Sequence, residues 1–274
     1  MSDMKDAEKK VWRLISDPPR QGALNMEIDD ALLHHLEESD RIATVVRFYE
    51  WEQPTLSLGQ HQKIELAADT DFCQANHIDI VHRPTGGRAV LHDQELTYAV
   101  ISNDQEIFPS TSVLGTYKQI AQGLCRGLKR LGVDALLADA PTHALEAPQN
   151  PVTIKHPCFN SPSRYELMVG QRKLVGSAQK RLQRSFLQHG SLLLDCDIPK
   201  LAHATRADPR ALAQSITTLR SLLGRQVDRM EVEQLLREGM EAEFSIQFEV
   251  RPLGPEELRA MSKYKDKISH GVSA

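Results

Sequence analysis

The chain has 274 residues, with 33 lysines and arginines against 37 aspartates and glutamates, so its formal net charge is −4. A hydrophobic share of 41% and a charged share of 26% are ordinary for a globular protein and exclude extended disorder and collagen. Because the chain has no basic excess and no apolar run of about 20 residues, we expect neither a nucleic-acid partner nor a membrane span.

The first half of the chain mixes helices and strands. Apolar residues at helical spacing predict a helix over residues 25–38, with Glu27, Asp29 and Asp30 in its first turn, where the helix dipole favours acidic groups. Further elements are expected at 44–51 (strand), 55–58 (strand), 67–76 (helix), 78–82 (strand) and 95–102 (strand). The strand at 78–82 runs directly into a Gly-Gly turn, which makes that turn a place to look for a ligand.

The second half begins with a long amphipathic helix from Ser112 to Gly132, followed by a loop at 140–157 that contains four prolines. Strand-like runs at 165–169, 173–178 and 186–194 predict an antiparallel meander. Helices at 209–223 and 232–244, a strand at 246–250 and a helix from Pro255 complete the chain. The order does not alternate regularly as βαβα, so we expect an α+β layered fold in a single domain over 1–274, with a helical C-terminal segment from about residue 198.

The turn after the strand at 78–82 reads Arg-Pro-Thr-Gly-Gly-Arg. Gly86 and Gly87 let backbone approach a ligand closely, and Arg83 and Arg88 could bind an anionic group, as in a phosphorylated or thioester-linked substrate. The alternative is an ordinary turn with solvated arginines. The run matches neither nucleotide-binding glycine motif, so no nucleotide cofactor is predicted.

The four cysteines are widely spaced, and none forms a C-x-x-C pair, so we expect neither disulfides nor a structural zinc site. Together with an N-terminus that lacks the apolar core of a secretory signal, this favours the cytoplasm. Cys158 lies between Pro157 and Pro162 at the end of the long loop, a context that suits a reactive thiol. The other three have apolar or helical neighbours, typical of small buried side chains.

Lys173 opens a run, Lys-Leu-Val-Gly-Ser-Ala-Gln, whose small residues leave room for a ligand. On a strand it shares a face with Val175 and Ser177, and if that face binds the ligand, Lys173 could lower a thiol pKa or pair with a substrate carbonyl or phosphate. The alternative is a hairpin lysine in water. His189 on the next strand could add a polar group to the same face or could be structural. The histidines show no metal-binding spacing.

These motifs together resemble the biotin/lipoate protein ligase superfamily, and most closely its octanoyl-[acyl-carrier-protein]:protein N-octanoyltransferases. The resemblance covers residues 12–195 and implies a mixed β-sheet flanked by helices, with an acyl tunnel beside the Gly-Gly turn. It makes Cys158 the acyl-accepting thiol and Lys173 the characteristic lysine of the superfamily. The implied substrate contacts are Arg83, Gly86, Gly87, Arg88, His92, Gly176, Ser177, Ala178, His189 and Gly190.

The resemblance implies transfer of an octanoyl group from octanoyl-acyl carrier protein to a lysine of lipoyl domains or of the glycine cleavage H protein. Thioester exchange is nearly isoenergetic, so no ATP or other cofactor is expected. The alternatives are an ATP-dependent lipoate ligase, an amidotransferase between carrier proteins, and a non-enzymatic acyl-binding paralogue. Three departures from the ligase pattern favour the transferase. Arg88 stands where ligases often have a third glycine, Glu95 to Tyr98 replace their Gly/Asn-rich continuation, and the C-terminal extension is short.

Acyl carrier proteins are acidic, so a local basic patch could steer their docking. The candidate members, near the predicted meander, are Arg164, Arg172, Lys180, Arg181 and Arg184. The alternative is an ordinary solvated charged face.

Overall fold

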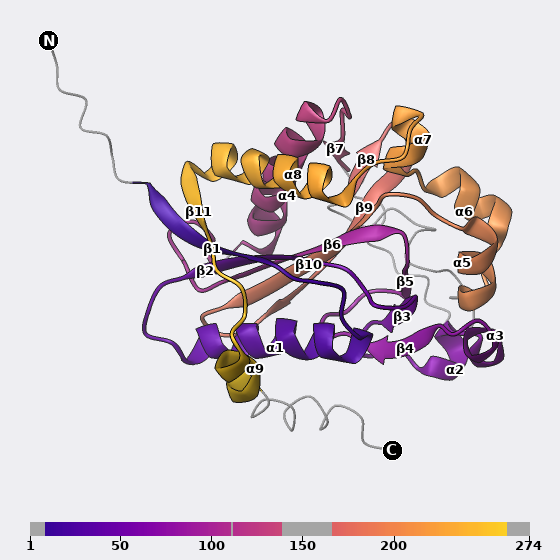
Figure 1. The fold of residues 1–274 in the computed structure, drawn as a ribbon, viewed down its shortest axis with the longest axis horizontal. Coiled ribbons are helices and arrows are strands. Elements are labelled where there is room, and N and C mark those ends of the chain that lie inside the picture. Colours follow the sequence, from indigo (N-terminus) through magenta and orange to yellow (C-terminus); the bar gives the residue numbers. More distant parts are fainter. Residues whose placement is uncertain (1–8, 111, 139–165, 262–274) are drawn as a thin grey trace, which may run out of the picture.

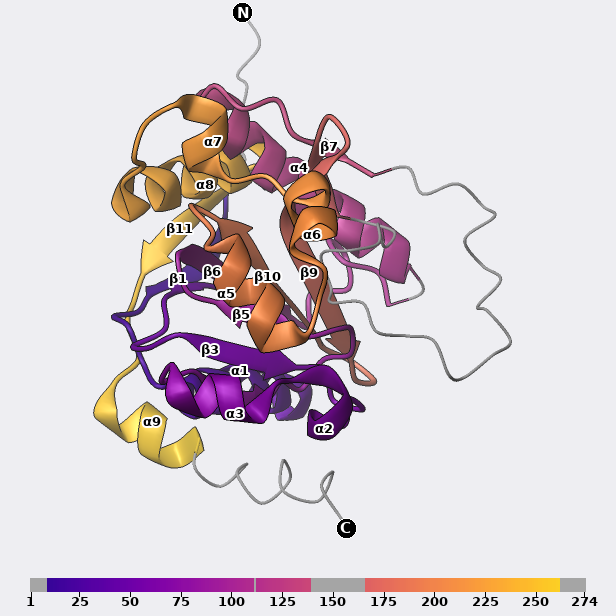
Figure 2. The same ribbon diagram turned by 90° about the vertical axis from the view of Figure 1, so that its right-hand side faces the viewer.

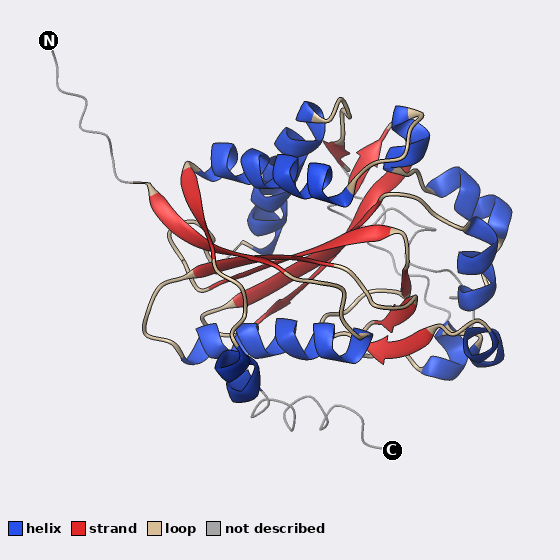
Figure 3. Cartoon of the chain, viewed as in Figure 1, coloured by secondary structure: helices blue, strands red, loops and turns tan. Residues whose placement is uncertain are grey.

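The computed structural model describes residues 9–110, 112–138 and 166–261, and its strands form two sheets between layers of helices (Figures 1 and 3). Within these residues the large sheet has eight strands. In spatial order they are β11 (Ile246–Val250), β1 (Lys10–Ser16), β2 (Thr44–Tyr49), β6 (Glu95–Ser102), β10 (Phe186–Leu193), β9 (Arg172–Arg181), β8 (Leu167–Val169) and β7 (Leu136–Leu137). The sheet is mixed, because β1 runs parallel to β11 and β2 whereas its other strand pairs are antiparallel.

Helices cover both faces of the large sheet (Figure 2). On one face lie α4 (Val113–Arg130) and α8 (Arg229–Phe244), and on the other lies α1 (Gly22–Glu38). Successive side chains of β6 point to opposite faces of the sheet and pack into different cores. Tyr98 belongs to the core under α4, and Ala99 belongs to the core under α1. All eight residues of β6 are therefore buried.

The small sheet has the strand order β4 (Asp79–His82), β3 (Thr55–Leu58) and β5 (Val90–His92). Its core packs against short helices. These are α2 (Ile64–Ala67), α3 (Thr70–Ala75), α5 (Ile198–Thr205) and α6 (Pro209–Ser215). The remaining helices are α7 (Leu219–Leu223) and α9 (Pro255–Met261). No helix of the described chain is long and apolar enough to cross a membrane.

The observed elements confirm the expected α+β fold, the mixed sheet and the antiparallel meander, and they correct several details. Helix α1 begins at Gly22, so Glu27, Asp29 and Asp30 lie beyond its first turn, and the two aspartates are buried. The helix expected at 209–223 is two helices, because residue 216 leaves α6 and pairs with Lys173 of β9. Strands β1, β5 and β7 and helix α2 were not predicted, and α5 begins at residue 198, where the helical C-terminal segment was expected.

Candidate active site

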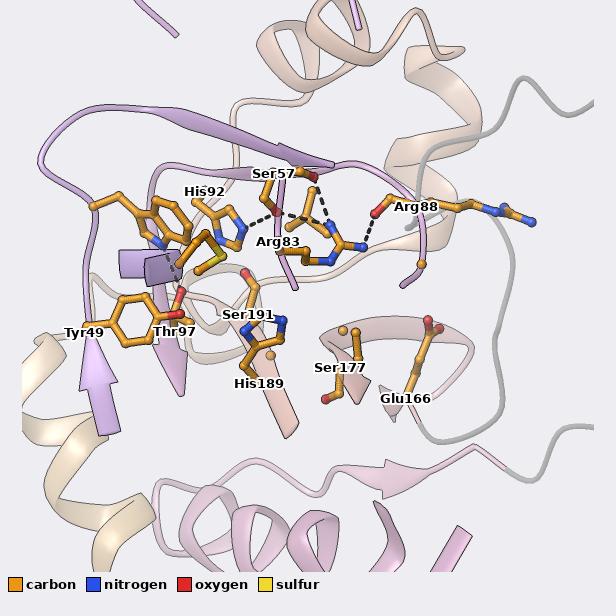
Figure 4. Close-up of a pocket in the computed structure, with 17 residues that line it drawn as sticks. Tyr49, Ser57, Arg83, Arg88, His92, Thr97, Glu166, Ser177, His189 and Ser191 are labelled. Atoms are coloured by element: carbon orange, nitrogen blue, oxygen red, sulfur yellow. Dashed lines mark hydrogen bonds between the residues drawn. The ribbon is translucent and has the colours of Figure 1, made fainter. Parts of the chain in front are cut away.

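A cavity of about 220 Å³ is lined by residues of both sheets and of α1. Figure 4 shows Glu166 and Arg88 toward one end of this pocket and Tyr49 and Thr97 toward the other. The lining residues are Met26, Tyr49, Trp51, Ser57, Arg83, Gly87, Arg88, Val90, His92, Thr97, Glu166, Gly176, Ser177, Ala178, His189, Gly190 and Ser191. Most of the residues expected to bind substrate therefore lie around one space.

Arg83 holds the Gly-Gly turn closed. Its guanidinium is buried and donates to the backbone carbonyls of Gly86 (2.8 Å from Nη2) and Arg88 (2.7 Å), and to the carbonyl of Ser57 (2.9 Å). Gly87 has φ +97°, and a Cβ there would lie 2.8 Å from Arg83 Nη2. The turn therefore needs glycine at this position, and the charge of Arg83 is directed into the turn.

A relay of buried side chains connects the Gly-Gly turn to α1. The Thr85 hydroxyl lies 2.8 Å from His189 Nε2, and His189 Nδ1 lies 3.0 Å from Asp29 Oδ2. Asp29 also accepts from Arg47 (2.8 Å) and from the Tyr49 hydroxyl (2.8 Å). Burial raises the pKa of Asp29, but these partners outweigh burial and bring it below its ordinary value. An ionised Asp29 favours the tautomer of His189 that carries a proton on Nδ1.

A second relay lies at the small sheet. Ser57 Oγ is 2.8 Å from His92 Nε2, and His92 Nδ1 is 3.3 Å from Glu95 Oε1, which also accepts from Thr97 (2.5 Å). The Trp51 ring stacks on the imidazole with centroids 4.0 Å apart. Burial lowers the pKa of His92 below its ordinary value, although Glu95 opposes the shift. The imidazole is therefore neutral at pH 7, and both its nitrogens have partners.

Lys173 forms a buried ion pair with Glu166, and each side chain is only 2% exposed. Glu166 belongs to the pocket wall, whereas Lys173 lies behind it at the start of β9. The Lys173 carbonyl accepts from the amide of Thr217 (2.9 Å), which fixes the backbone. Buried charges need such compensation, because removing one partner leaves the other unpaired in a low-dielectric interior.

The ligand face of β9 differs from the face that carries Val175 and Ser177. Val175 packs in the core beneath α4, and the Ser177 hydroxyl lies 2.8 Å from the Tyr98 hydroxyl of that same core. Ser177 borders the pocket, but its side chain is directed away from it (Figure 4). The side-chain face of β9 toward the pocket is therefore that of Gly176 and Ala178, so small residues form this wall.

The structure places the candidate site residues as follows. Those that line the pocket are Arg83, Gly87, Arg88, His92, Gly176, Ser177, Ala178, His189 and Gly190. Gly86 lies in the turn but not in the lining, and Lys173 connects to the lining through Glu166. Cys158 lies outside the described residues.

Lining residues that the sequence did not single out are Met26, Tyr49, Trp51, Ser57, Val90, Thr97, Glu166 and Ser191. Most belong to strands that read as ordinary core. The best available signal was an acidic residue, Glu166, at the start of an otherwise apolar strand-like run.

The three described cysteines are poor nucleophiles. Burial raises the pKa of the Cys73 thiol, and it raises those of Cys125 and Cys196 to about 11 and about 12. Thiols with such values stay protonated at neutral pH. In the described part of the chain, no group of three or more His, Cys, Asp or Glu side chains could hold a metal ion.

The suggested basic patch is partly neutralised within the protein. Lys180 pairs with Asp30 (3.0 Å), and Arg184 lies 3.7 Å from Asp40. Arg164 lies outside the described residues. The role of this face in steering the carrier protein stays a prediction. These ion pairs reduce the net positive charge that the sequence indicated for it.

Comparison with known proteins assigns the chain to a family. A profile of the lipoyl protein ligase A/B catalytic domain matches residues 21–241. The chain is 36% identical over 263 residues to the octanoyltransferase LipM of Bacillus subtilis, covering 92% of each protein. It is 44% identical over 193 residues to the octanoyltransferase LipM of Geobacillus kaustophilus, covering 69% of this chain and 67% of that protein.

Solved structures agree on the fold. A lipoate-protein ligase A bound with ATP superposes with a TM-score of 0.75 at 21% identity, covering 96% of each chain. A chain from the structure of a bi-partite lipoate protein ligase and its E2 lipoyl domain from Thermoplasma acidophilum gives 0.74 at 19% identity, covering 95% and 94%. These similarities confirm the expected catalytic-domain fold.

Proposed function

Since this chain belongs to the lipoyl protein ligase A/B catalytic-domain family and is an acyltransferase, we propose that it transfers an octanoyl group to a lysine of a lipoyl-carrying protein. The donor is octanoyl-acyl carrier protein, and the acceptors are lipoyl domains or the glycine cleavage H protein. The names of the LipM relatives support the octanoyl group, and the 92% coverage of the Bacillus subtilis protein supports a shared activity.

The observation that carries the proposal is the pocket. Its walls combine apolar side chains, such as Met26 and Val90, with the small residues Gly176 and Ala178. Its imidazoles form hydrogen bonds to other side chains and do not require polar groups on a ligand. An unbranched acyl chain fits such a space because its methylenes gain burial against these walls.

The proposed chemistry takes place in two steps. Cys158 first attacks the thioester of the carrier protein and takes the acyl group, and the acceptor lysine then attacks the new thioester and forms an amide. Lys173, behind Glu166 in the pocket wall, contributes positive charge to the field in which the tetrahedral intermediate forms. Glu166, the first described residue after the segment that contains Cys158, borders the pocket.

Transfer in the absence of ATP tests the proposal. The purified protein is mixed with octanoyl-acyl carrier protein and a lipoyl domain, and the mass of the lipoyl domain is followed. A gain of one octanoyl group without nucleotide supports the transferase. A gain that requires octanoate and ATP would select the ligase. Transfer only from an octanoylated H protein to the lipoyl domain would select the amidotransferase.

A further inference from the structure

The Glu166 carboxylate occupies an unusual position at the pocket. It is 2% exposed, it is ion-paired with the buried ammonium of Lys173, and it forms part of the pocket wall. Figure 4 shows it pointing toward the side of the pocket that carries Arg83 and Arg88. Among the described lining residues it is the one carboxylate.

Amide formation requires a proton acceptor close to the attacking amine. A free lysine amine has a pKa of about 10.4 and is protonated at neutral pH. The amine attacks a thioester carbonyl only in its neutral form, after one proton has gone to solvent. On attack its nitrogen becomes positively charged and must lose a second proton before the amide is stable. The other bases in the lining are His92 and His189, and the single site on each ring nitrogen already has a side-chain partner. A carboxylate can accept several hydrogen bonds, so the ion pair with Lys173 does not exhaust the capacity of Glu166.

We propose that Glu166 accepts the proton of the acceptor amine and passes it to the departing thiolate, a step that rests on the octanoyl transfer proposed above. The neutral amine forms the C–N bond, the C–S bond breaks, and the proton that the positively charged nitrogen releases moves to the carboxylate and then to sulfur. The products are an amide and a thiol, and Glu166 returns to its ionised form. Lys173 acts here as a positioning residue that holds the carboxylate.

Charge explains why the ammonium of Lys173 is accompanied by a carboxylate. A lone buried ammonium would repel the charged amine of an incoming lysine. The ion pair with Glu166 removes that repulsion, and the carboxylate attracts the amine. The same carboxylate lies in the wall of the pocket in which we place the acyl group.

Glu166→Gln separates the two half-reactions. We expect acyl uptake from octanoyl-acyl carrier protein, measured by intact mass, to change by no more than a few-fold. Transfer to the lipoyl domain should fall by about 10²-fold at pH 7, at the low end for general base catalysis. The transfer rate of this variant should rise steadily between pH 7 and pH 9.5, because hydroxide then removes the proton, whereas the wild-type profile is flatter. Glu166→Asp, which keeps a carboxylate, should restore part of the transfer at pH 7.

Two further variants keep the test decisive. Asp104→Asn removes a buried carboxylate outside the pocket lining that pairs with Lys10, and it should not steepen the pH profile. If Glu166→Gln does not fold because Lys173 loses its counter-ion, Glu166→Gln combined with Lys173→Met is compared with Lys173→Met alone. A transfer defect with the wild-type pH profile, or an equal loss in both half-reactions, would overturn the role of Glu166. Failure of the wild type to transfer octanoate would instead overturn the proposed function.

Discussion

The imidazole Nε2 of His189 lies 2.8 Å from the hydroxyl of Thr85, so strand β10 holds the Gly-Gly turn directly, across 104 residues of sequence. The other nitrogen of His189 faces the buried carboxylate of Asp29 on α1. His189 thus connects the Gly-Gly turn to β10 and to α1, so the conformation of the turn depends on the relative position of these two elements.

We expect His189→Ala to weaken both the fold and the activity. It leaves the Thr85 hydroxyl and one lone pair of Asp29 without their buried partner, which costs about 1–3 kcal/mol in the free energy of unfolding. Urea unfolding measures the loss, and octanoyl transfer should fall with it. Thr85→Val should reproduce much of the effect, whereas Thr85→Ser keeps the hydroxyl and should behave like the wild type. Equal stability of all four proteins would show that the relay does not hold the turn.

The paired glycines should differ in their tolerance of a side chain. Gly87 has φ +97°, and a Cβ there meets Arg83, so Gly87→Ala should lower the free energy of unfolding by about 1–3 kcal/mol and reduce transfer. A Cβ at Gly86 has no atom within 4 Å, so Gly86→Ala is the matched control and should be nearly neutral for stability. Thermal unfolding of the two variants compares them. A Gly86→Ala protein less stable than Gly87→Ala would contradict the turn geometry.

Stability should fall as the pH drops from 7 to 5, in part through His92. The pKa of His92 in the folded protein lies below the unfolded value of about 6.5. Between these two pH values the unfolded chain binds one more proton than the folded chain, so the free energy of unfolding falls as the pH drops. The lowered pKa of Asp29 acts in a more acidic window, below about pH 4, because its stabilisation is lost only as the carboxylate protonates. Urea unfolding of the wild type and of His92→Gln at pH 7 and pH 5 tests this. The variant should lose less stability over that range, and an identical loss would contradict the burial of a neutral imidazole.

Acyl chain length should matter, because each buried methylene stabilises the bound chain. Shortening the chain from eight carbons to six removes roughly 1.6 kcal/mol, or about fifteen-fold in transfer efficiency. Palmitoyl chains should fail more sharply, since a packed wall does not yield easily. Hexanoyl, octanoyl and palmitoyl carrier proteins competing in one reaction measure the preference, and Gly176→Val should shift it to shorter chains or abolish binding. A flat preference would contradict the acyl pocket.

Elements with a strong local pattern could be predicted from the sequence. Helix α4 carries its apolar residues at helical spacing, and the meander of β8, β9 and β10 is marked by the turn at Gly170. Strand β1 could not be recognised, because Arg13 interrupts its apolar run. That arginine is compensated by Glu257, 244 residues away, and such a partner is visible only in the fold.

The candidate site was predictable where glycines and small residues mark it. Its charged residues were harder, because their roles depend on burial. Asp29 read as a helix-dipole residue, yet it lies buried between Arg47 and His189. The role of Glu166 depends on its buried ion pair with Lys173, and burial of this kind is not visible in the local sequence pattern.

The decisive measurement is the mass of the intact protein after mixing with octanoyl-acyl carrier protein without ATP. We expect a gain of one octanoyl group that hydroxylamine removes, that maps to Cys158 and that is lost in Cys158→Ala. Cys73→Ala, Cys125→Ala and Cys196→Ser should still be acylated, because burial keeps those three thiols protonated. Octanoyl transfer to a lipoyl domain at the wild-type rate by Cys158→Ala would contradict the covalent mechanism.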